Sequence, residues 1–80
     1  MRTLTGTIQL VQESRFRLVT ETGQSKLFVL SHAAALAPED LPPLQRAQAR
    51  VTVSFTPARG LYADIAHRIR EADSPTGDAR

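Results

Sequence analysis

RFRLVTETGQSKLFVL, residues 15–30, is the stretch that decides the expected fold. Two short runs of β-branched, aromatic and aliphatic residues flank a polar turn from Glu21 to Lys26, with Gly23 near its centre. A glycine-containing loop between two such runs is typical of paired antiparallel strands. This hairpin carries two of the three Phe residues and three of the ten Lys and Arg residues, so we expect function on its solvent face.

Three further segments predict strands. Residues 4–11 alternate apolar and polar side chains, and Gly6 inside them indicates a bulge or a close backbone approach. Residues 51–56 alternate most clearly. Residues 61–70 fit a strand or a helix, because apolar residues recur at both spacings. We favour a strand to about Ile69, since it follows a hairpin-like turn and would pair an otherwise open barrel edge.

The region between residues 30 and 50 predicts one helix. The Ala-rich segment 32–37 suits a helix of one to two turns after Ser31. Residues 38–44 contain the adjacent Pro42 and Pro43, which remove backbone donors, so we expect an irregular connector. Its leucines, with Leu36, should cap one end of the core.

The order of three strands, a short helix and two strands predicts an all-β fold. It is that of a five-stranded antiparallel oligonucleotide/oligosaccharide-binding (OB-fold) barrel with the helix between strands 3 and 4. We assign residues 1–70 to this barrel. Residues 71–80 are polar and carry nothing to bury, so a disordered C-terminal tail is expected.

Composition narrows the function classes. Eighty residues make one small domain, and the absence of Cys removes disulfides, thiol nucleophiles and thiolate metal sites. Residues 1–70 hold nine basic against five acidic residues, so the barrel is the basic part, which favours a polyanionic partner. No signal-like or membrane-spanning run is visible, so we expect a cytoplasmic protein without a membrane partner.

No catalytic, metal or cofactor site is predicted. The two histidines, His32 and His67, stand apart without a His-x3-His spacing or an acidic cluster. None of the serines lies in a Gly-x-Ser-x-Gly context, and no glycine-rich run precedes a helix. The sequence therefore favours a binding domain rather than an enzyme.

Three segments have the pattern of known motifs: Gly6-Thr7-Ile8, residues 15–20 (RFRLVT) and residues 26–30 (KLFVL). In this order they resemble the opening Gly-Thr-Val, the motif Gly-Phe-Gly-Phe-Ile-Thr and the motif Asp-Val-Phe-Val-His of the cold-shock domains. The resemblance covers roughly residues 4–65 and implies binding of single-stranded nucleic acid by aromatic side chains on the first three strands.

Carried over by position, the resemblance keeps two of six aromatic positions, Phe16 and Phe28. The other four positions hold Leu10, Leu18, Leu30 and Ser31. Two registers stay open for the hairpin. The family arrangement turns Phe16 outward and Arg17 inward, whereas plain alternation turns Arg15 and Arg17 outward, which avoids burying an unpaired guanidinium.

The sequence therefore predicts weak, largely non-sequence-specific binding of single-stranded RNA or DNA, mainly through phosphates. The expected site residues are Arg15, Phe16, Arg17, Lys26, Phe28, Arg59 and Tyr62. The alternative is a protein-interaction or self-association module with a protein partner or a homodimer. Its surface would be an apolar barrel face made of Leu10, Leu18, Phe28 and Leu30.

Overall fold

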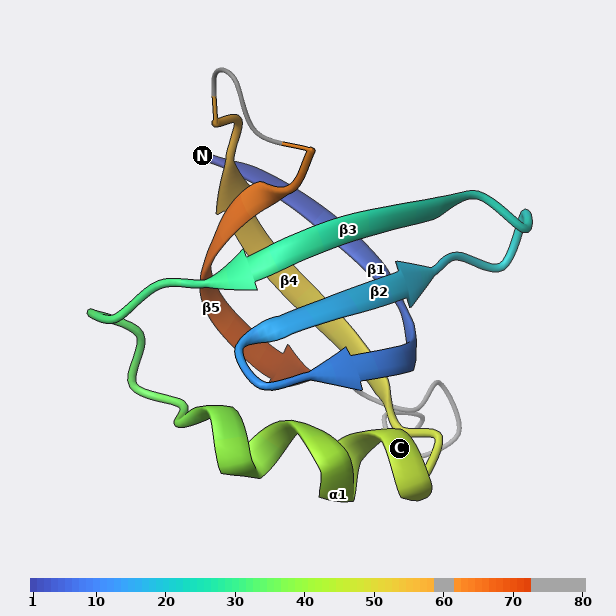
Figure 1. Cartoon of the computed structure of the whole chain (residues 1–80). Coiled ribbons are helices and arrows are strands. Elements are labelled where there is room, and N and C mark those ends of the chain that lie inside the picture. Colours follow the sequence, from blue (N-terminus) through green and yellow to red (C-terminus); the bar gives the residue numbers. More distant parts are fainter. Residues whose placement is uncertain (59–61, 73–80) are drawn as a thin grey trace, which may run out of the picture.

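A computed structural model describes residues 1–58 and 62–72 as a closed barrel of five strands with one short helix (Figure 1). The strands are β1 (Arg2–Gln12), β2 (Arg15–Val19), β3 (Ser25–Leu30), β4 (Arg50–Thr56) and β5 (Asp64–Glu71). Their order around the barrel is β1-β2-β3-β5-β4, and β3 runs parallel to β5. The prediction of a wholly antiparallel barrel is wrong at this pair. A closed ring with an odd number of strands cannot alternate direction at every step.

Side chains alternate between the barrel interior and solvent along β2 and β3. Phe16 is 1% exposed and Phe28 is fully buried, whereas Arg15 and Arg17 are exposed. The Phe16 and Phe28 rings stack with centroids 5.3 Å apart, and Phe55 meets Phe28 edge-on at 5.0 Å. The outward-basic register is therefore the one that forms. The expected role of Phe16 and Phe28 as stacking platforms is wrong, because a ring enclosed in the core cannot reach a base.

The rest of the core comes from every strand and from the helix. It consists of Ile8, Leu18, Leu30, Leu41, Val51, Val53, Ala66 and Ile69. Three of the four residues predicted to form an apolar outer face are therefore buried, and only Leu10 is exposed. The apolar face expected for a protein partner does not form as predicted, because strand alternation turns its other members inward.

β1 bends so that its first half pairs with β4 and its second half with β2. Gly6 lies where the strand passes from one partner to the other. A Cβ atom at Gly6 would lie 2.8 Å from the carbonyl carbon of Val19 and closer still to the carbonyl oxygen. The predicted close backbone approach at Gly6 is confirmed, and barrel closure is its cause.

A β-bulge at Gln9 changes which side chains of β1 face outward. Ile8 and Leu10 pair with consecutive residues of β2, so Gln9 between them is an extra residue. An extra residue shifts the alternation by one position. Leu10 is consequently 43% exposed, and Val11 packs against the core.

The helix lies between β3 and β4 in the chain, but not at the predicted residues. The Ala-rich segment forms turns and bends, a 3₁₀ turn covers Pro38–Asp40, and α1 spans Leu41–Arg46. Both the predicted helix and the predicted irregular connector are wrong. Pro42 and Pro43 lie in the first helical turn, where backbone amides have no intrahelical acceptor, so proline removes no hydrogen bond there.

Helix α1 covers one end of the barrel. Leu41 is fully buried, and Leu36 and Leu44 pack against the core, as predicted for the leucines of this region. The Gln45 side-chain amide donates a hydrogen bond of 2.8 Å to the backbone carbonyl of Gln9. The bulge and the helix therefore hold each other in place.

The segment that fitted both a strand and a helix forms β5, which confirms the strand prediction. The register with β4 pairs Val53 with Ile69, both inward-facing. The strand includes Glu71, and the Ala72 amide donates to the carbonyl of Arg50 at 2.7 Å, so the folded part continues past the predicted boundary. The predicted disordered tail falls, from residue 73 onward, outside the described residues.

Candidate functional site

Two rows of outward-facing side chains cross β1, β2 and β3. Strand register places Arg17 between Leu10 and Leu27, and Arg15 between Gln12 and Val29. We call these six residues the arginine–aliphatic face. Each arginine is central in its row because β2 lies between the other two strands.

The neighbours of each arginine set its chemistry. Directly opposed residues on adjacent strands have Cβ atoms about 5 Å apart, so Leu27 and Val29 lie within reach of the arginine stems. An arginine can cover apolar surface with its methylenes while its guanidinium stays in water. Leu27 and Val29 are half-buried, and both arginines are exposed. The face thus presents two cations above an aliphatic floor.

Neither guanidinium on this face is neutralised within the described residues. The ion pairs among those residues join Lys26 to Asp64 and Arg50 to Glu21, and neither pair lies on this face. Arg15 and Arg17 lie two residues apart on one strand, so their Cα atoms are about 7 Å apart. This spacing is comparable with the distance between successive phosphates of an extended single strand.

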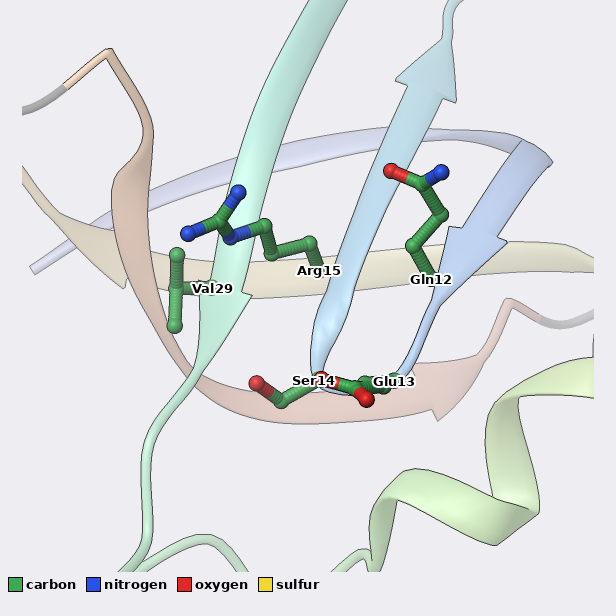
Figure 2. Close-up of a pocket in the computed structure, with 5 residues that line it drawn as sticks. All are labelled: Gln12, Glu13, Ser14, Arg15 and Val29. Carbon is green, nitrogen blue, oxygen red and sulfur yellow. The ribbon is translucent and has the colours of Figure 1, made fainter.

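A hollow of about 680 Å³ lies at one end of the face (Figure 2). It is lined by Gln12 at the end of β1, Glu13 and Ser14 in the β1–β2 turn, Arg15 on β2 and Val29 on β3. In Figure 2 the Arg15 side chain extends across β3 toward Val29, and Ser14 lies at the turn. The guanidinium, amide and hydroxyl groups here are the donors that phosphate and sugar oxygens accept. The Glu13 carboxylate opposes an anion.

Tyr62 extends the face toward the start of β5. Its side chain is fully exposed, and it lines a hollow of about 140 Å³ together with Arg15, Leu27, Val29 and Ala63. The chain has three Phe, one Tyr and no Trp, and all three Phe are buried. Tyr62 is therefore the aromatic side chain that remains available for stacking on a base.

Lys26 is not part of this face. Its position places it in the inward-facing series with Phe28, at the mouth of the barrel. Its Nζ lies 3.0 Å from the Asp64 carboxylate and 5.7 Å from the centroid of the Phe55 ring. The expected phosphate contact at Lys26 stays a prediction, and the ion pair with Asp64 compensates the charge that such a contact would use.

The structure brings together some of the other expected site residues but not all of them. Arg15, Arg17 and Tyr62 are brought together, whereas Arg59 falls outside the described residues. Sequence reasoning missed Gln12, Leu27 and Val29 as members of the face. The tight turn that places Gln12 opposite Arg15 was a usable signal, because it fixes the register of the first two strands.

The described residues contain no cluster of three or more metal-ligating side chains, and no helix among them could span a membrane. No family model matches the chain, and no curated protein or solved structure matches it either.

Proposed function

We propose that this chain is an OB-fold domain that binds single-stranded nucleic acid weakly and largely without sequence preference. The ligand would lie on the arginine–aliphatic face. The observation that carries the proposal is the pair of outward-facing arginines, Arg15 and Arg17, which form no ion pair with any described residue and lie at the centre of a three-strand face bordered by Tyr62.

The barrel order supports the OB-fold part of the proposal. In that fold the face of strands 2 and 3 contacts oligonucleotides. The three segments that resemble cold-shock motifs lie on β1, β2 and β3. Kinship with that family belongs to the same proposal, with contacts from Arg15 and Arg17 at its Gly positions, because Phe16 and Phe28 at its aromatic positions are buried.

The energetics favour weak, salt-sensitive binding. Base stacking contributes about 1–3 kcal/mol per base, and one exposed aromatic ring supplies at most one such platform. The remaining attraction comes from phosphates, whose neutralisation makes log affinity fall by about 0.7 per log unit of salt for each contact. Such binding carries little base preference.

Fluorescence anisotropy with labelled oligo(dT) and oligo(U) at low salt tests this function. The double variant Arg15→Ala/Arg17→Ala should weaken binding by roughly tenfold, since exposed ion pairs contribute up to about 1 kcal/mol each and about 1.4 kcal/mol is a factor of ten. The matched control Arg2→Ala/Arg46→Ala removes the same charge from exposed positions elsewhere. Equal losses in both variants, or no binding of the unmodified protein at micromolar concentration, would contradict the proposal.

A further inference from the structure

A second outward face is formed by the first half of β1 together with β4 and β5. Register places Ser54 between Thr3 and Arg68, and Thr52 between Thr5 and Arg70. We call these six residues the hydroxyl–arginine face. In Figure 1, β2 and β3 cross in front of β4, so this face and the arginine–aliphatic face look in opposite directions.

The hydroxyl–arginine face contains no apolar or aromatic side chain. The Thr5 and Thr52 hydroxyls are hydrogen-bonded at 2.9 Å, which leaves one hydroxyl hydrogen of the pair free to donate outward. Arg68 and Arg70 are exposed. Arg70 also lines a hollow of about 250 Å³ with Thr52, Glu71 and Ala72.

Charge on this face is positive. Within residues 1–58 and 62–72, neither Arg68 nor Arg70 forms an ion pair. The neighbouring Arg50 on β4 is paired with Glu21 at 3.2 Å, so its charge is compensated. Glu71 follows the inward-facing series by register but is exposed at the end of β5, where it lines the same hollow as Arg70, so its carboxylate opposes an anion there.

The threonines alone need no ligand, because threonine suits the solvent side of any strand. Arg68 and Arg70 add a pair of cations at a fixed spacing to this hydroxyl surface. They are two residues apart on one strand, about 7 Å between Cα atoms, as Arg15 and Arg17 are on β2. Arginine and hydroxyl side chains are common contacts of phosphate and sugar, and such contacts carry no base information.

We propose that the hydroxyl–arginine face is a second surface for single-stranded nucleic acid that contacts only the sugar–phosphate backbone. One domain would then hold two segments of strand on opposite sides and bring them together. This inference rests on the proposed function, because it takes the same class of ligand. It adds a second site, a stoichiometry of two and a bridging activity.

Two experiments at low salt test the inference: native mass spectrometry with oligo(dT), and energy transfer between donor-labelled and acceptor-labelled oligo(dT). We expect two oligonucleotides per monomer and a transfer signal on adding protein. The variant Arg68→Ala/Arg70→Ala should bind one oligonucleotide, lose the transfer signal and lose about 1.4 from the total salt slope. The control Arg68→Lys/Arg70→Lys keeps the charge and should retain most bridging.

The outcomes separate this inference from the proposed function. One oligonucleotide per monomer, lost in Arg15→Ala/Arg17→Ala and unaffected in Arg68→Ala/Arg70→Ala, overturns the inference and leaves the proposed function standing. No binding to either face overturns both. Bridging that requires a protein dimer in sedimentation overturns the inference. Unchanged thermal melting of each variant shows that a loss is not unfolding.

Discussion

The arginine–aliphatic face and the hydroxyl–arginine face carry the same cation in different surroundings. Arg15 and Arg17 are central in their rows, between Leu10 or Gln12 on one side and aliphatic residues of β3 on the other. Arg68 and Arg70 lie at the edge of rows built from hydroxyls. The aliphatic neighbours of Arg15 and Arg17 offer an apolar floor on which a base could lie, whereas the hydroxyl neighbours of Arg68 and Arg70 suit phosphate and sugar oxygens. We therefore expect the cross-strand neighbours, rather than the charge, to distinguish what the two faces bind.

The largest effect we expect is a loss of folding stability, which would disturb both faces because β1 contributes residues to each. Gly6→Ala should destabilise the barrel by about 3 kcal/mol or more, because its new methyl would overlap the Val19 backbone carbonyl, which cannot move without opening β1 from β2. Urea unfolding would measure the loss. Gly23→Ala is the control: it meets no atom within 4 Å and suffers only from its positive φ of 87°, so it should cost about 1–2 kcal/mol. A Gly6→Ala protein as stable as the unmodified chain would contradict the closure geometry.

The next largest effect is on oligonucleotide binding, and it distinguishes the arginine–aliphatic face from the other face. Tyr62→Ala should weaken oligonucleotide binding by roughly tenfold on the arginine–aliphatic face, because one stack on a base contributes at least about 1 kcal/mol. Tyr62→Phe keeps the ring and should bind nearly as the unmodified protein does. Anisotropy in the background Arg68→Ala/Arg70→Ala isolates this face. If alanine and phenylalanine variants bind equally there, Tyr62 does not stack.

A smaller effect on stability and on affinity is expected at Glu13, in the β1–β2 turn beside the arginine–aliphatic face. Glu13 has a φ of 56°, which costs a non-glycine residue about 1–2 kcal/mol, so Glu13→Gly should stabilise the barrel by up to ~1 kcal/mol after the entropy of glycine is subtracted. It also removes a carboxylate from the hollow beside Arg15, so oligonucleotide affinity should rise. Glu13→Gln separates the effect of the carboxylate from that of the backbone strain, because it should raise the affinity without raising the unfolding midpoint. Equal midpoints for the two variants would contradict the strain at this turn.

The smallest effect concerns a cation that lies on neither face. Lys26→Ala removes the ion pair with Asp64, and since the two side chains are 39% and 17% exposed we expect a loss below about 1 kcal/mol. Oligonucleotide affinity should fall no more than in Arg46→Ala, which removes a charge from α1. A loss as large as that of Arg17→Ala would place Lys26 back among the ligand contacts.

Alternation alone predicted most of the barrel. The run of β-branched and aromatic residues in the hairpin predicted the strands, and the cost of burying a guanidinium favoured outward arginines, although two registers stayed open. The same alternation could have placed Lys26 in the inward series with Phe28, and could have excluded both aromatic residues as stacking platforms. The family resemblance favoured the opposite orientation and competed with this simpler pattern.

Other features depend on contacts that no local pattern contains. The bulge at Gln9 turns Leu10 outward, and it is held by a hydrogen bond from Gln45, far away in the chain. The helix forms at Leu41–Arg46 rather than in the Ala-rich segment, because Leu41 can be buried in the barrel end and alanines offer little surface to bury. Helix propensity was therefore outweighed by tertiary packing.

The anchoring of α1 has a consequence for engineering and for evolution. The helix is fixed at its own residues, by Leu41 in the barrel end and by Gln45 at the bulge, rather than by the loop that precedes it. Lengthening a flexible loop costs little conformational entropy, about 0.6 kcal/mol for each doubling. His32 and Ala33 are exposed and form a turn before the core-packed Ala34 and Leu36, so this turn is a place where we expect the chain to accept an inserted peptide or a whole domain without disturbing either arginine-bearing face.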